Sequence, residues 1–389
     1  MDIKQIAGLT NDVSAEVLGE SAPVVDENLG NIVDVGTAVF NANSFDAFVR
    51  TLVDKVGRMV FVDRVYRGRV PSVIRDGWEY GACLQKLQCE LPDAQENDAW
   101  ELQSGTSYDT QVFLAPVISA NYYNLRVTFE IQMSTVEMQL KSAFNNATQA
   151  ASFIAMIYNA IENSMTIKLD ALIMRAIDNI IAETVYDDFG ANAITGGSGV
   201  KAVNVLYLYN QTVAEADALT ASNCMQSPAF LRFATNLMSM YKDRLAVESS
   251  LFNIDGKPRF TPADRLHFVV LSEFAAGVKS YLQSDTFHDE MVALPDHEVV
   301  PFWQGSGTDY AFGNTGTIDV VTASNHNIKV TGVLGVMFDS DAVAVCNMNR
   351  YTTSAYNARG MFTNTWFKMD AAYMNSFQEN CVVFFAAAA

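Results

Sequence analysis

Hydrophobic and polar positions alternate strictly between residues 125 and 133. One parity carries only apolar side chains, and these are Leu125, Val127, Phe129, Ile131 and Met133. The intervening positions are polar or charged. A period of two residues is typical of a strand with one buried face, so we predict a strand here. Ser134-Thr135-Val136-Glu137 follows directly and has the pattern of a capping box, which predicts that a helix begins at this point.

An unusually long helix is predicted after this strand. No proline or glycine occurs between Val136 and Gly190, and apolar residues recur three and four positions apart as one continuous stripe. We therefore expect a helix from Val136 to about Glu183. The pair Asp187-Asp188 lies beyond that end and is expected to be solvated. The glycines at 196, 197 and 199 predict a flexible loop.

The segments before the strand look unable to fold alone. The first 45 residues are acidic and lack sustained periodicity, which predicts an extended arm, and a short helix is expected over 45–56. Residues 66–125 predict a long two-stranded loop with a polar tip. Its alternation changes phase near Gln85-Lys86, which predicts a bulge or a strong twist in a long strand. Because a two-stranded ribbon is marginal in water, we expect neighbouring subunits to order it.

The second half of the chain mixes helical and strand patterns. Helices are predicted over Ser227–Ser250 and over Ser272–Gln283, the latter capped by Ser272. Apolar runs bounded by turn residues predict seven strands. These are Leu266–Leu271, Val299-Val300, Ile318–Val321, Ile328–Val330, Val333–Phe338, Ala342–Cys346 and Cys381–Phe385.

Composition narrows the classes of protein. The chain has 25 basic and 44 acidic residues and a formal net charge of −19, and half of its residues are apolar. The negative charge argues against sequence-independent nucleic-acid binding, which needs phosphate neutralisation. The start lacks the layout of a signal peptide, and the uncharged stretch 142–161 is too polar for a membrane span. The five scattered cysteines form no C-x-x-C pair, so we expect reduced thiols that mostly pack as small core residues.

Basic residues gather between Arg50 and Arg75, against few acids. Two main interpretations stay open for this segment: an electrostatic contact with an acidic surface of another copy, and an ordinary solvated surface. Contact with nucleic acid is a third, which the lack of interleaved aromatic residues disfavours. Together with two aromatic residues of the following strand pattern, it supplies the candidates for inter-subunit contact. These are Arg58, Arg64, Arg67, Arg69, Arg75, Trp78 and Tyr80.

No catalytic constellation is found. The glycine-rich stretches at 196–199 and 305–307 match neither a dinucleotide fingerprint nor a P-loop, and the four histidines have no metal-ligand spacing. We expect no enzymatic activity, no cofactor and no metal site.

Three short stretches, in their order and spacing, resemble one known family. They are Phe48–Gly57, Met156–Ser164 inside the predicted long helix, and a closing set made of Asp339-Ser340-Asp341, Asn357-Ala358-Arg359-Gly360, Trp366 and Asn380–Phe384. The order of arm, long β-loop, long helix, mixed middle and closing strands resembles the major capsid protein of tailed bacteriophages, most closely those of small short-tailed phages.

The resemblance implies an α+β, HK97-like capsid fold with five parts. They are an N-terminal arm with a short helix (1–62), an extended two-stranded loop (63–125), a peripheral-domain strand and spine helix (126–190), an axial domain (191–335) and closing strands of the peripheral domain (336–389). It further implies pentamers and hexamers in an icosahedral virion shell, assembled in the host cytoplasm and enclosing double-stranded DNA without sequence-specific binding. Scaffolding, portal and decoration proteins are the implied partners, and no membrane is involved.

Two alternatives stay open. An encapsulin-like compartment uses the same fold to enclose an enzyme. A soluble α+β enzyme with an unrecognised site is the other, and its extended loop would then act as a lid.

Overall fold

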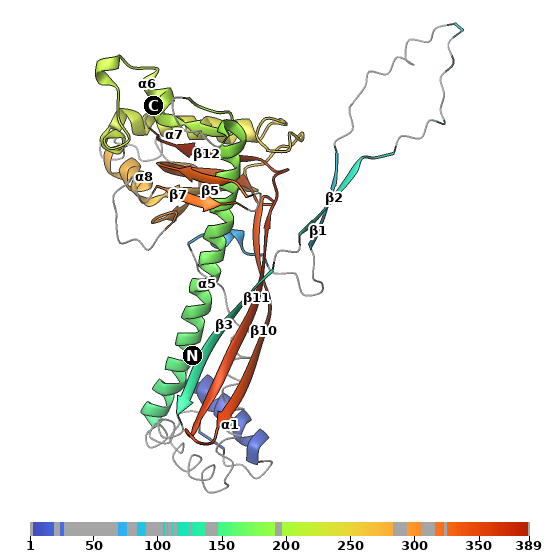
Figure 1. Ribbon diagram of the computed structural model, residues 1–389, viewed down its shortest axis with the longest axis vertical. Coiled ribbons are helices and arrows are strands. Elements are labelled where there is room, and N and C mark those ends of the chain that lie inside the picture. Colours follow the sequence, from blue (N-terminus) through green and yellow to red (C-terminus); the bar gives the residue numbers. More distant parts are fainter. Residues whose placement is uncertain are drawn as a thin grey trace. The chain divides into compact units, whose positions relative to one another are not determined.

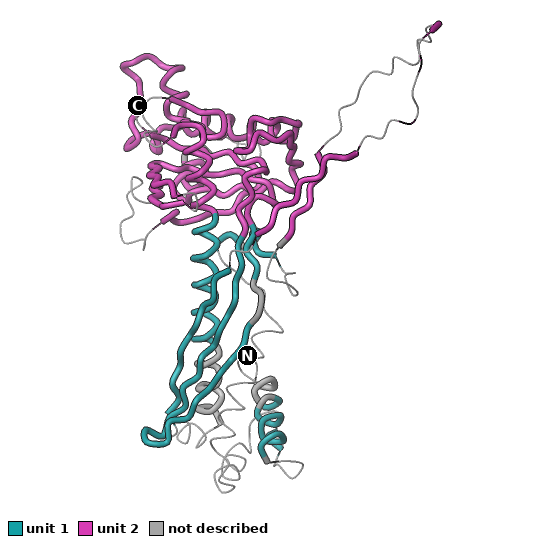
Figure 2. The backbone as a smooth tube through the Cα atoms, turned by 45° about the vertical axis from the view of Figure 1, so that its right-hand side comes forward, with its two compact units in different colours: residues 1–79, 126–176, 344–373 teal, residues 80–125, 177–343, 374–389 magenta. Residues whose placement is uncertain are grey.

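A computed structural model of the chain describes residues 3–18, 24–26, 69–75, 84–90, 104–105, 107, 111, 115–123, 126–136, 147–190, 197–282, 294–304, 316–322 and 325–387. Helices and strands both contribute to the fold (Figure 1). The chain forms two compact units, each assembled from separate segments of the sequence (Figure 2). The first unit draws on residues 1–79, 126–176 and 344–373, and the second on residues 80–125, 177–343 and 374–389.

The first unit contains a three-stranded sheet with the strand order β10-β11-β3. The strands are β3 (Arg126–Val136), β10 (Val343–Asn357) and β11 (Phe362–Asn375). β3 runs antiparallel to β11, with Val136 opposite Phe362 and Arg126 opposite Ala372. Along β3 the apolar positions are half-buried and the polar positions are exposed. The predicted alternating strand is therefore confirmed.

The predicted capping box is wrong. Ser134, Thr135 and Val136 stay in β3 and pair with residues 362–364 of β11. The Ser134 hydroxyl donates to the side-chain oxygen of Asn364 at 2.5 Å, so it acts across the sheet and not along the chain. A continuous ladder of backbone hydrogen bonds with β11 outweighs one local capping interaction. Within the described residues, the following helix begins at Ala147.

A buried carboxylate ties the three strands together. Asp370 of β11 is only 2% exposed, and it accepts hydrogen bonds from Thr128 at 2.8 Å and from Tyr351 at 3.2 Å. Arg126 forms an ion pair with the same carboxylate. Burial alone raises the pKa of Asp370, but the hydrogen bonds from Thr128 and Arg126 outweigh it, and the pKa lies below its ordinary value.

A helix occupies the start of the chain, where we expected an extended arm, so that expectation is wrong for these residues. α1 spans Ile3–Leu18, and its buried positions recur three and four apart at Ala7, Thr10, Val13 and Ser14. Two of these four are hydroxyl residues, which hides the helical period from a search for apolar positions alone. The Asn11 side-chain amide also bonds both backbone groups of Val25, at 2.5 and 2.9 Å. The helix expected over 45–56 lies outside the described residues.

The long helix is confirmed. α5 spans Ala147–Phe189, 43 residues, and contributes to both units (Figure 1). Its earlier part buries a stripe that includes Ile161, Met165 and Leu169. From Leu172 to Val185 nearly every position is buried. A helix that is buried on nearly all sides is typical of a protein interior, and from Ile177 onward α5 belongs to the second unit.

The end of α5 differs from the prediction. Asp187 and Asp188 lie in the last turn, and Asp188 accepts hydrogen bonds from the backbone N–H groups of Lys201 and Ala202 at 2.7 and 2.8 Å. The Lys201 ammonium pairs with both carboxylates. A Cβ atom at Gly199 would overlap the Asp188 carboxylate. Residues 197–199 are therefore tied to the helix end, and the predictions of a solvated acid pair and a flexible loop are wrong here.

The second unit contains a mixed five-stranded sheet with the order β4-β12-β9-β5-β6. Its strands are β4 (Ala202–Asn204), β5 (Leu266–Leu271), β6 (Glu298–Val300), β9 (Val333–Asp339) and β12 (Cys381–Phe385). β12 and β5 both run antiparallel to β9, while β4 and β6 add in parallel at the two edges. The strands predicted at the positions of β5, β9 and β12 are confirmed, and the one predicted at 342–346 is the start of the longer β10.

Three helices pack on this sheet. They are α6 (Val205–Asn210), α7 (Pro228–Leu245) and α8 (Ser272–Gly277), and α8 continues into a π-helical turn, Val278–Leu282. Ser227 caps α7 through the Phe230 N–H, whereas Ser272 makes no cap because Leu271 holds that position in α8. The core between helices and sheet contains Phe230, Leu231, Met238, Phe268, Phe274, Met337, Val382 and Phe384.

The remaining elements are short. The second unit has two two-stranded sheets, one of β1 (Leu84–Cys89) with β2 (Ile118–Tyr123) and one of β7 (Ile318–Val321) with β8 (Asn327–Val330). Single 3-10 turns occur at Pro71–Val73, Glu215–Asp217 and Cys224–Gln226. None of the helices in the described ranges is both long and apolar enough to cross a bilayer.

The cysteines behave mostly as core residues. Cys224, Cys346 and Cys381 are buried, as predicted, while Cys89 is exposed. Burial raises the pKa of the Cys224 thiol to about 11 and that of Cys381 to about 12. These two thiols stay protonated and unreactive near neutral pH.

Replacing the buried carboxylate of the first unit tests its role. Asp370→Asn should lower the free energy of unfolding by about 2 kcal/mol at pH 7, because hydrogen bonds to a buried charge are lost. Since the native pKa of Asp370 is depressed, its stabilising effect is present above the unfolded value of about 3.9 and is lost as the pH falls through the native pKa. Denaturant unfolding of the unassembled chain at pH 7 and pH 3 measures both effects, with exposed Asp243→Asn as the control. A deficit that persists unchanged at pH 3 would contradict the assignment.

Candidate assembly surface

The ribbon of β1 and β2 is regular at its root. The two strands pair antiparallel without interruption, from Leu84 opposite Tyr123 to Cys89 opposite Ile118, and the Glu90 N–H adds a bond to the Val117 carbonyl at 2.9 Å. Of the bulge or strong twist predicted near Gln85-Lys86, the bulge is therefore wrong. The hydrophobic pattern changes phase because the two faces of the ribbon have different surroundings, and not because the register slips.

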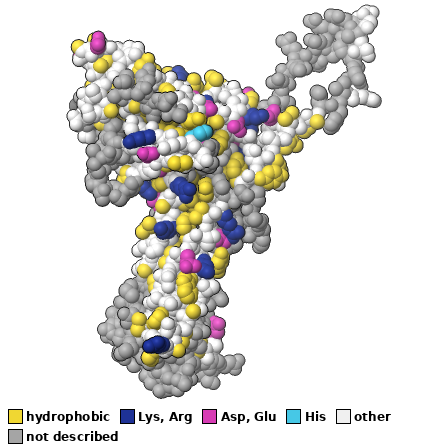
Figure 3. Space-filling view, viewed as in Figure 1, with side chains coloured by type: hydrophobic (Ala, Val, Ile, Leu, Met, Phe, Trp, Pro, Cys, Tyr) yellow, Lys and Arg dark blue, Asp and Glu magenta, His cyan; other side chains and the backbone are white. Residues whose placement is uncertain are grey.

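One face of the ribbon is apolar and exposed to solvent. We call it the outer face, and it comprises Leu87, Cys89, Ile118, Ala120 and Tyr122, with the polar Gln85 at one end, where its amide donates to the Tyr122 hydroxyl at 3.0 Å. Leu87, Ile118 and Tyr122 are 63%, 62% and 65% exposed. Figure 3 shows hydrophobic side chains gathered on this part of the ribbon. Large apolar side chains side by side in solvent are typical of a surface that another protein covers.

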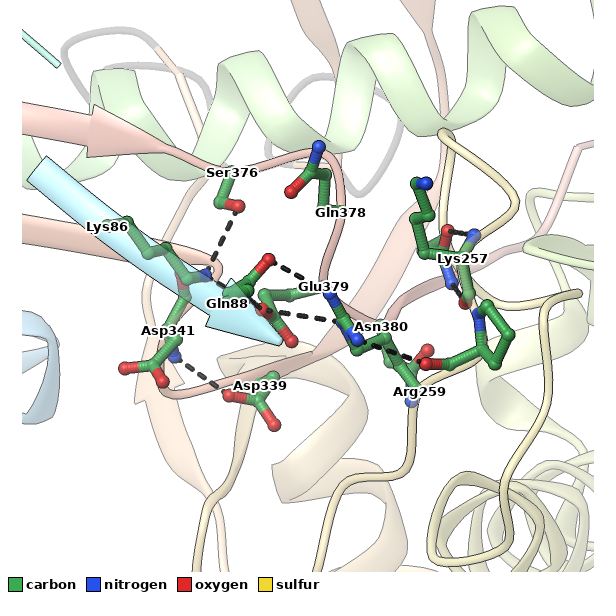
Figure 4. Close-up of polar contacts among 12 residues, drawn as sticks. Lys86, Gln88, Lys257, Arg259, Asp339, Asp341, Ser376, Gln378, Glu379 and Asn380 are labelled. Atoms are coloured by element: carbon green, nitrogen blue, oxygen red, sulfur yellow. Dashed lines mark hydrogen bonds and ion pairs between the residues drawn. The ribbon is translucent and has the colours of Figure 1, made fainter. Parts of the chain in front are cut away.

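The opposite, inner face is polar and contacts two turns of the second unit (Figure 4). The Lys86 ammonium bonds the Glu379 carboxylate at 2.8 Å, the Ser376 hydroxyl at 3.3 Å and the Asp341 carbonyl at 3.2 Å. The Lys86 and Glu379 side chains are only 12% and 8% exposed. No local pattern indicates this contact, because Lys86 and its partners are separated by more than 250 residues.

Gln88, the next inner-face residue, completes the contact. Its amide N–H₂ donates to Glu379, and its carbonyl oxygen accepts from the Arg259 guanidinium at 2.9 Å. Arg259 also lies 4.0 Å from the Glu379 carboxylate. On β2, the Asn121 amide donates to the side-chain oxygen of Gln378 at 2.7 Å. The inner face is thus held by polar groups from both strands.

A further ion pair lies just past β1. The Lys257 ammonium bonds the Glu90 carboxylate at 2.5 Å. The hydrogen bond from Lys257 and its positive charge lower the pKa of Glu90. The Lys257 backbone is itself fixed by both side-chain groups of Asn253. This pair extends the polar contact along the ribbon.

The two turns that receive the ribbon are joined to each other. The Ser376 N–H donates to the Ala342 carbonyl at 2.7 Å, and the Asp339 N–H donates to the Asn380 carbonyl at 3.0 Å. The buried Asp339 carboxylate accepts from the Thr261 hydroxyl at 2.9 Å and pairs with Arg265. These bonds connect the turns to β9 and β12, so the ribbon rests on a rigid part of the sheet.

The predicted contact residues lie elsewhere. Arg69 and Arg75 belong to the first unit, where the Arg69 N–H and guanidinium bond Asp170 of α5 at 2.9 and 2.6 Å. The Arg75 N–H donates to the Val345 carbonyl at 3.0 Å, and its side chain is exposed. Arg58, Arg64, Arg67, Trp78 and Tyr80 lie outside the described residues. The inter-subunit role of all seven stays a prediction.

The fold is that of a phage capsid protein. It is similar to a chain in the capsid structure of Staphylococcus phage Andhra, at a TM-score of 0.51 and 11% identity, over 84% of this chain and 86% of that one. Weaker matches include a chain from the structure of the head fiber and inner core protein gp22 of native bacteriophage P68 (TM-score 0.49, 10% identity, 83% and 86% covered). Another is the capsid structure of the Cyanophage P-SCSP1u (TM-score 0.42, 12% identity, 82% and 87% covered).

The family model of the Phi29-like phage major capsid protein matches residues 9–385, and the chain belongs to that family. No curated protein matches the sequence. The predicted α+β, HK97-like capsid fold and the structural role in an icosahedral virion shell are confirmed. The family match does not favour the encapsulin-like or the enzymatic alternative.

Removing the arginine that bridges ribbon and turn tests the polar contact. Arg259→Ala should lower the free energy of unfolding by about 1–3 kcal/mol, because Gln88 and Glu379 each lose a partner in a buried setting. Arg244→Ala removes an exposed arginine of α7 that stacks on Tyr241 and serves as the control. Denaturant unfolding of the unassembled chain measures both. Equal effects of the two substitutions would argue against the role given to Arg259.

Proposed function

We propose that this capsid protein closes its shell by burying the outer face of the β1–β2 ribbon against a neighbouring copy. The observation that carries the proposal is the opposite chemistry of the two ribbon faces. The inner face contacts the rest of the chain through polar groups, while Leu87, Ile118 and Tyr122 of the outer face remain in solvent. Burying apolar side chains of this size stabilises an interface by about 25 cal/mol for each Å² removed from water.

Repetition of such a contact supports closed rings. A ribbon on one copy and its docking surface on the next are different surfaces, so the contact is heterologous and closes into pentamers and hexamers when the rotation permits. Stable assemblies of this kind use large apolar interfaces, often more than 2,000 Å². Within each copy we propose five parts. They are an N-terminal arm (1–62), an extended loop (63–125), a peripheral-domain strand and spine helix (126–190), an axial domain (191–335) and closing strands of the peripheral domain (336–389).

The contents and surroundings of the shell are proposed on charge and family grounds. A net charge of −19 disfavours adhesion to phosphate backbones, so the shell would enclose double-stranded DNA without sequence-specific binding. Assembly in the host cytoplasm, with scaffolding, portal and decoration proteins as partners, follows the pattern of the family. The protein would act structurally, without catalysis. The basic segment that includes Arg69 and Arg75 would contact an acidic surface of another copy.

A native thiol reports on the outer face without any substitution. Cys89 lies on that face and is exposed, whereas Cys381 is buried in the sheet. In the unassembled chain, Cys89 should react with iodoacetamide and Cys381 should not, because thiol reactivity requires access. In assembled shells, the labelling rate of Cys89 should fall by about ten-fold or more. Peptide mass spectrometry separates the sites. An equal rate for Cys89 in shells and free chain would contradict burial of this face.

A charge on the outer face tests whether it is needed. Leu87→Asp should abolish shell formation at concentrations where the native chain assembles, because burying an unpaired carboxylate costs several kcal/mol. Val321→Asp makes the same chemical change at a residue of β7 with 67% exposure and is the matched control. Electron microscopy and light scattering score assembly, and circular dichroism checks folding. Normal shells from a folded Leu87→Asp chain would refute the proposal.

A further inference from the structure

The inner face of the ribbon suggests a device that the capsid role alone does not require. The Lys86 ammonium donates to three acceptors, one for each of its hydrogens. The acceptors belong to two turns that are far apart in sequence, one around Asp341 and one around Glu379. Ions this deeply buried are screened little by salt and interact strongly. The position of Lys86 therefore fixes the ribbon relative to both turns at once.

The charges along this contact also specify one register. Lys86 and Glu90 carry opposite charges on the ribbon, with the neutral Gln88 between them. On the receiving side, Glu379 meets Lys86, Arg259 meets Gln88, and Lys257 meets Glu90. The smallest slip that keeps the same face inward is two residues. A slip in one direction brings Lys86 beside Arg259, which juxtaposes like charges. A slip in the other direction brings Glu90 beside Arg259, but it separates Lys86 from Glu379 and Glu90 from Lys257, so one ion pair replaces two.

The contact is specific without being part of the apolar core. The contacts of Lys86, Gln88 and Asn121 with the turns are polar, while the core under the helices consists of residues such as Phe268, Phe384 and Met337. A buried ion pair adds little net stability compared with apolar packing, yet removal of one partner is costly. Such a contact can therefore fix one arrangement and still be released without opening the core.

We propose that Lys86, Gln88 and Glu90, with Glu379, Arg259 and Lys257, form an electrostatic latch. The latch holds the ribbon root in one orientation and register in the unassembled chain and presents the outer face ready for a neighbouring copy. Its release frees the ribbon root while the five-stranded sheet stays folded. The consequence for assembly rests on the proposed function, because it takes the outer face to be the surface that docks.

A double-mutant cycle with hydrogen exchange on the unassembled chain tests the latch. Lys86→Met and Glu379→Gln keep side-chain volume and remove one charge each. Each should raise amide exchange in the peptides over 84–90, 118–123 and 376–380 by about ten-fold, because a buried charge is left unpaired. Exchange in β5 and the centre of β9 should not change. The double variant should exchange about as fast as the faster single variant, because its second substitution acts on a pair that the first has already broken. Lys368→Met, which breaks the exposed pair with Glu130 in the first unit, is the matched control and should leave the ribbon unaffected.

Two results would overturn the latch. Unchanged ribbon exchange in both single variants would show that the pair does not hold the ribbon. Equal loosening of β5 and β9 would show that the pair supports the core and not a separate contact. Since both substitutions conserve volume, circular dichroism and the β5 peptides identify any variant that fails to fold, and unfolding of both single variants counts as this second result.

Assembly kinetics separate failure of the latch from failure of the proposed function. Lys86→Met should assemble about ten-fold more slowly at low protein concentration, because the ribbon is no longer oriented in advance, and still form shells in which Cys89 is protected. Unchanged kinetics together with a protected Cys89 would reject only the latch. A reactive Cys89 in native shells would reject the docking role of the outer face, whatever the exchange data show.

Discussion

The β1–β2 ribbon buries only one of its two faces against its own chain, and the proposed function depends on how the two faces are used. Here the face turned toward the second unit is polar, and the face turned away carries Leu87, Ile118 and Tyr122. That is the reverse of the usual arrangement, in which apolar side chains point toward the protein's own core. In the proposed function, the larger gain from apolar burial comes from assembly.

The rest of the second unit supplies a firm base for this ribbon. β9 and β12 are central strands of the five-stranded sheet. The turn around Asp341 follows β9, and the turn around Glu379 precedes β12, and both turns bond Lys86. The turns are linked by backbone hydrogen bonds and by the buried Asp339. A polar contact needs such rigidity, because its energy depends on distance and direction far more than that of apolar packing does. The first unit uses the same principle at Asp370, where one buried carboxylate joins three strands.

Local patterns predicted the regular elements well. The alternation at 125–133 marked β3, the absence of glycine and proline marked α5, and the apolar runs marked β5, β9 and β12. Errors arose where a distant partner changed the outcome. Ser134 looked like a helix cap because its cross-strand partner Asn364 is invisible locally. Asp188 looked solvated because Lys201 and Ala202 return to it from the following loop. Two hydroxyl residues in the buried stripe hid α1.

The candidate site was the hardest part to predict, for the same reason. The apolar parity of Leu87 and Cys89 was readable, but a sequence pattern does not tell which face meets the protein and which meets solvent. That choice depends on Glu379, Arg259 and Lys257, which lie more than 160 residues away. Conversely, charge density drew attention to the segment around Arg69, whose guanidinium is bound to Asp170 within its own unit.

A cryo-electron microscopy reconstruction of shells assembled from the purified native chain tests the central claim most directly. The informative observation is what lies against the outer face of each β1–β2 ribbon. We predict that apolar side chains of a neighbouring copy cover Leu87, Ile118 and Tyr122. Outer faces that remain in solvent, or that fold back onto their own chain, would contradict it.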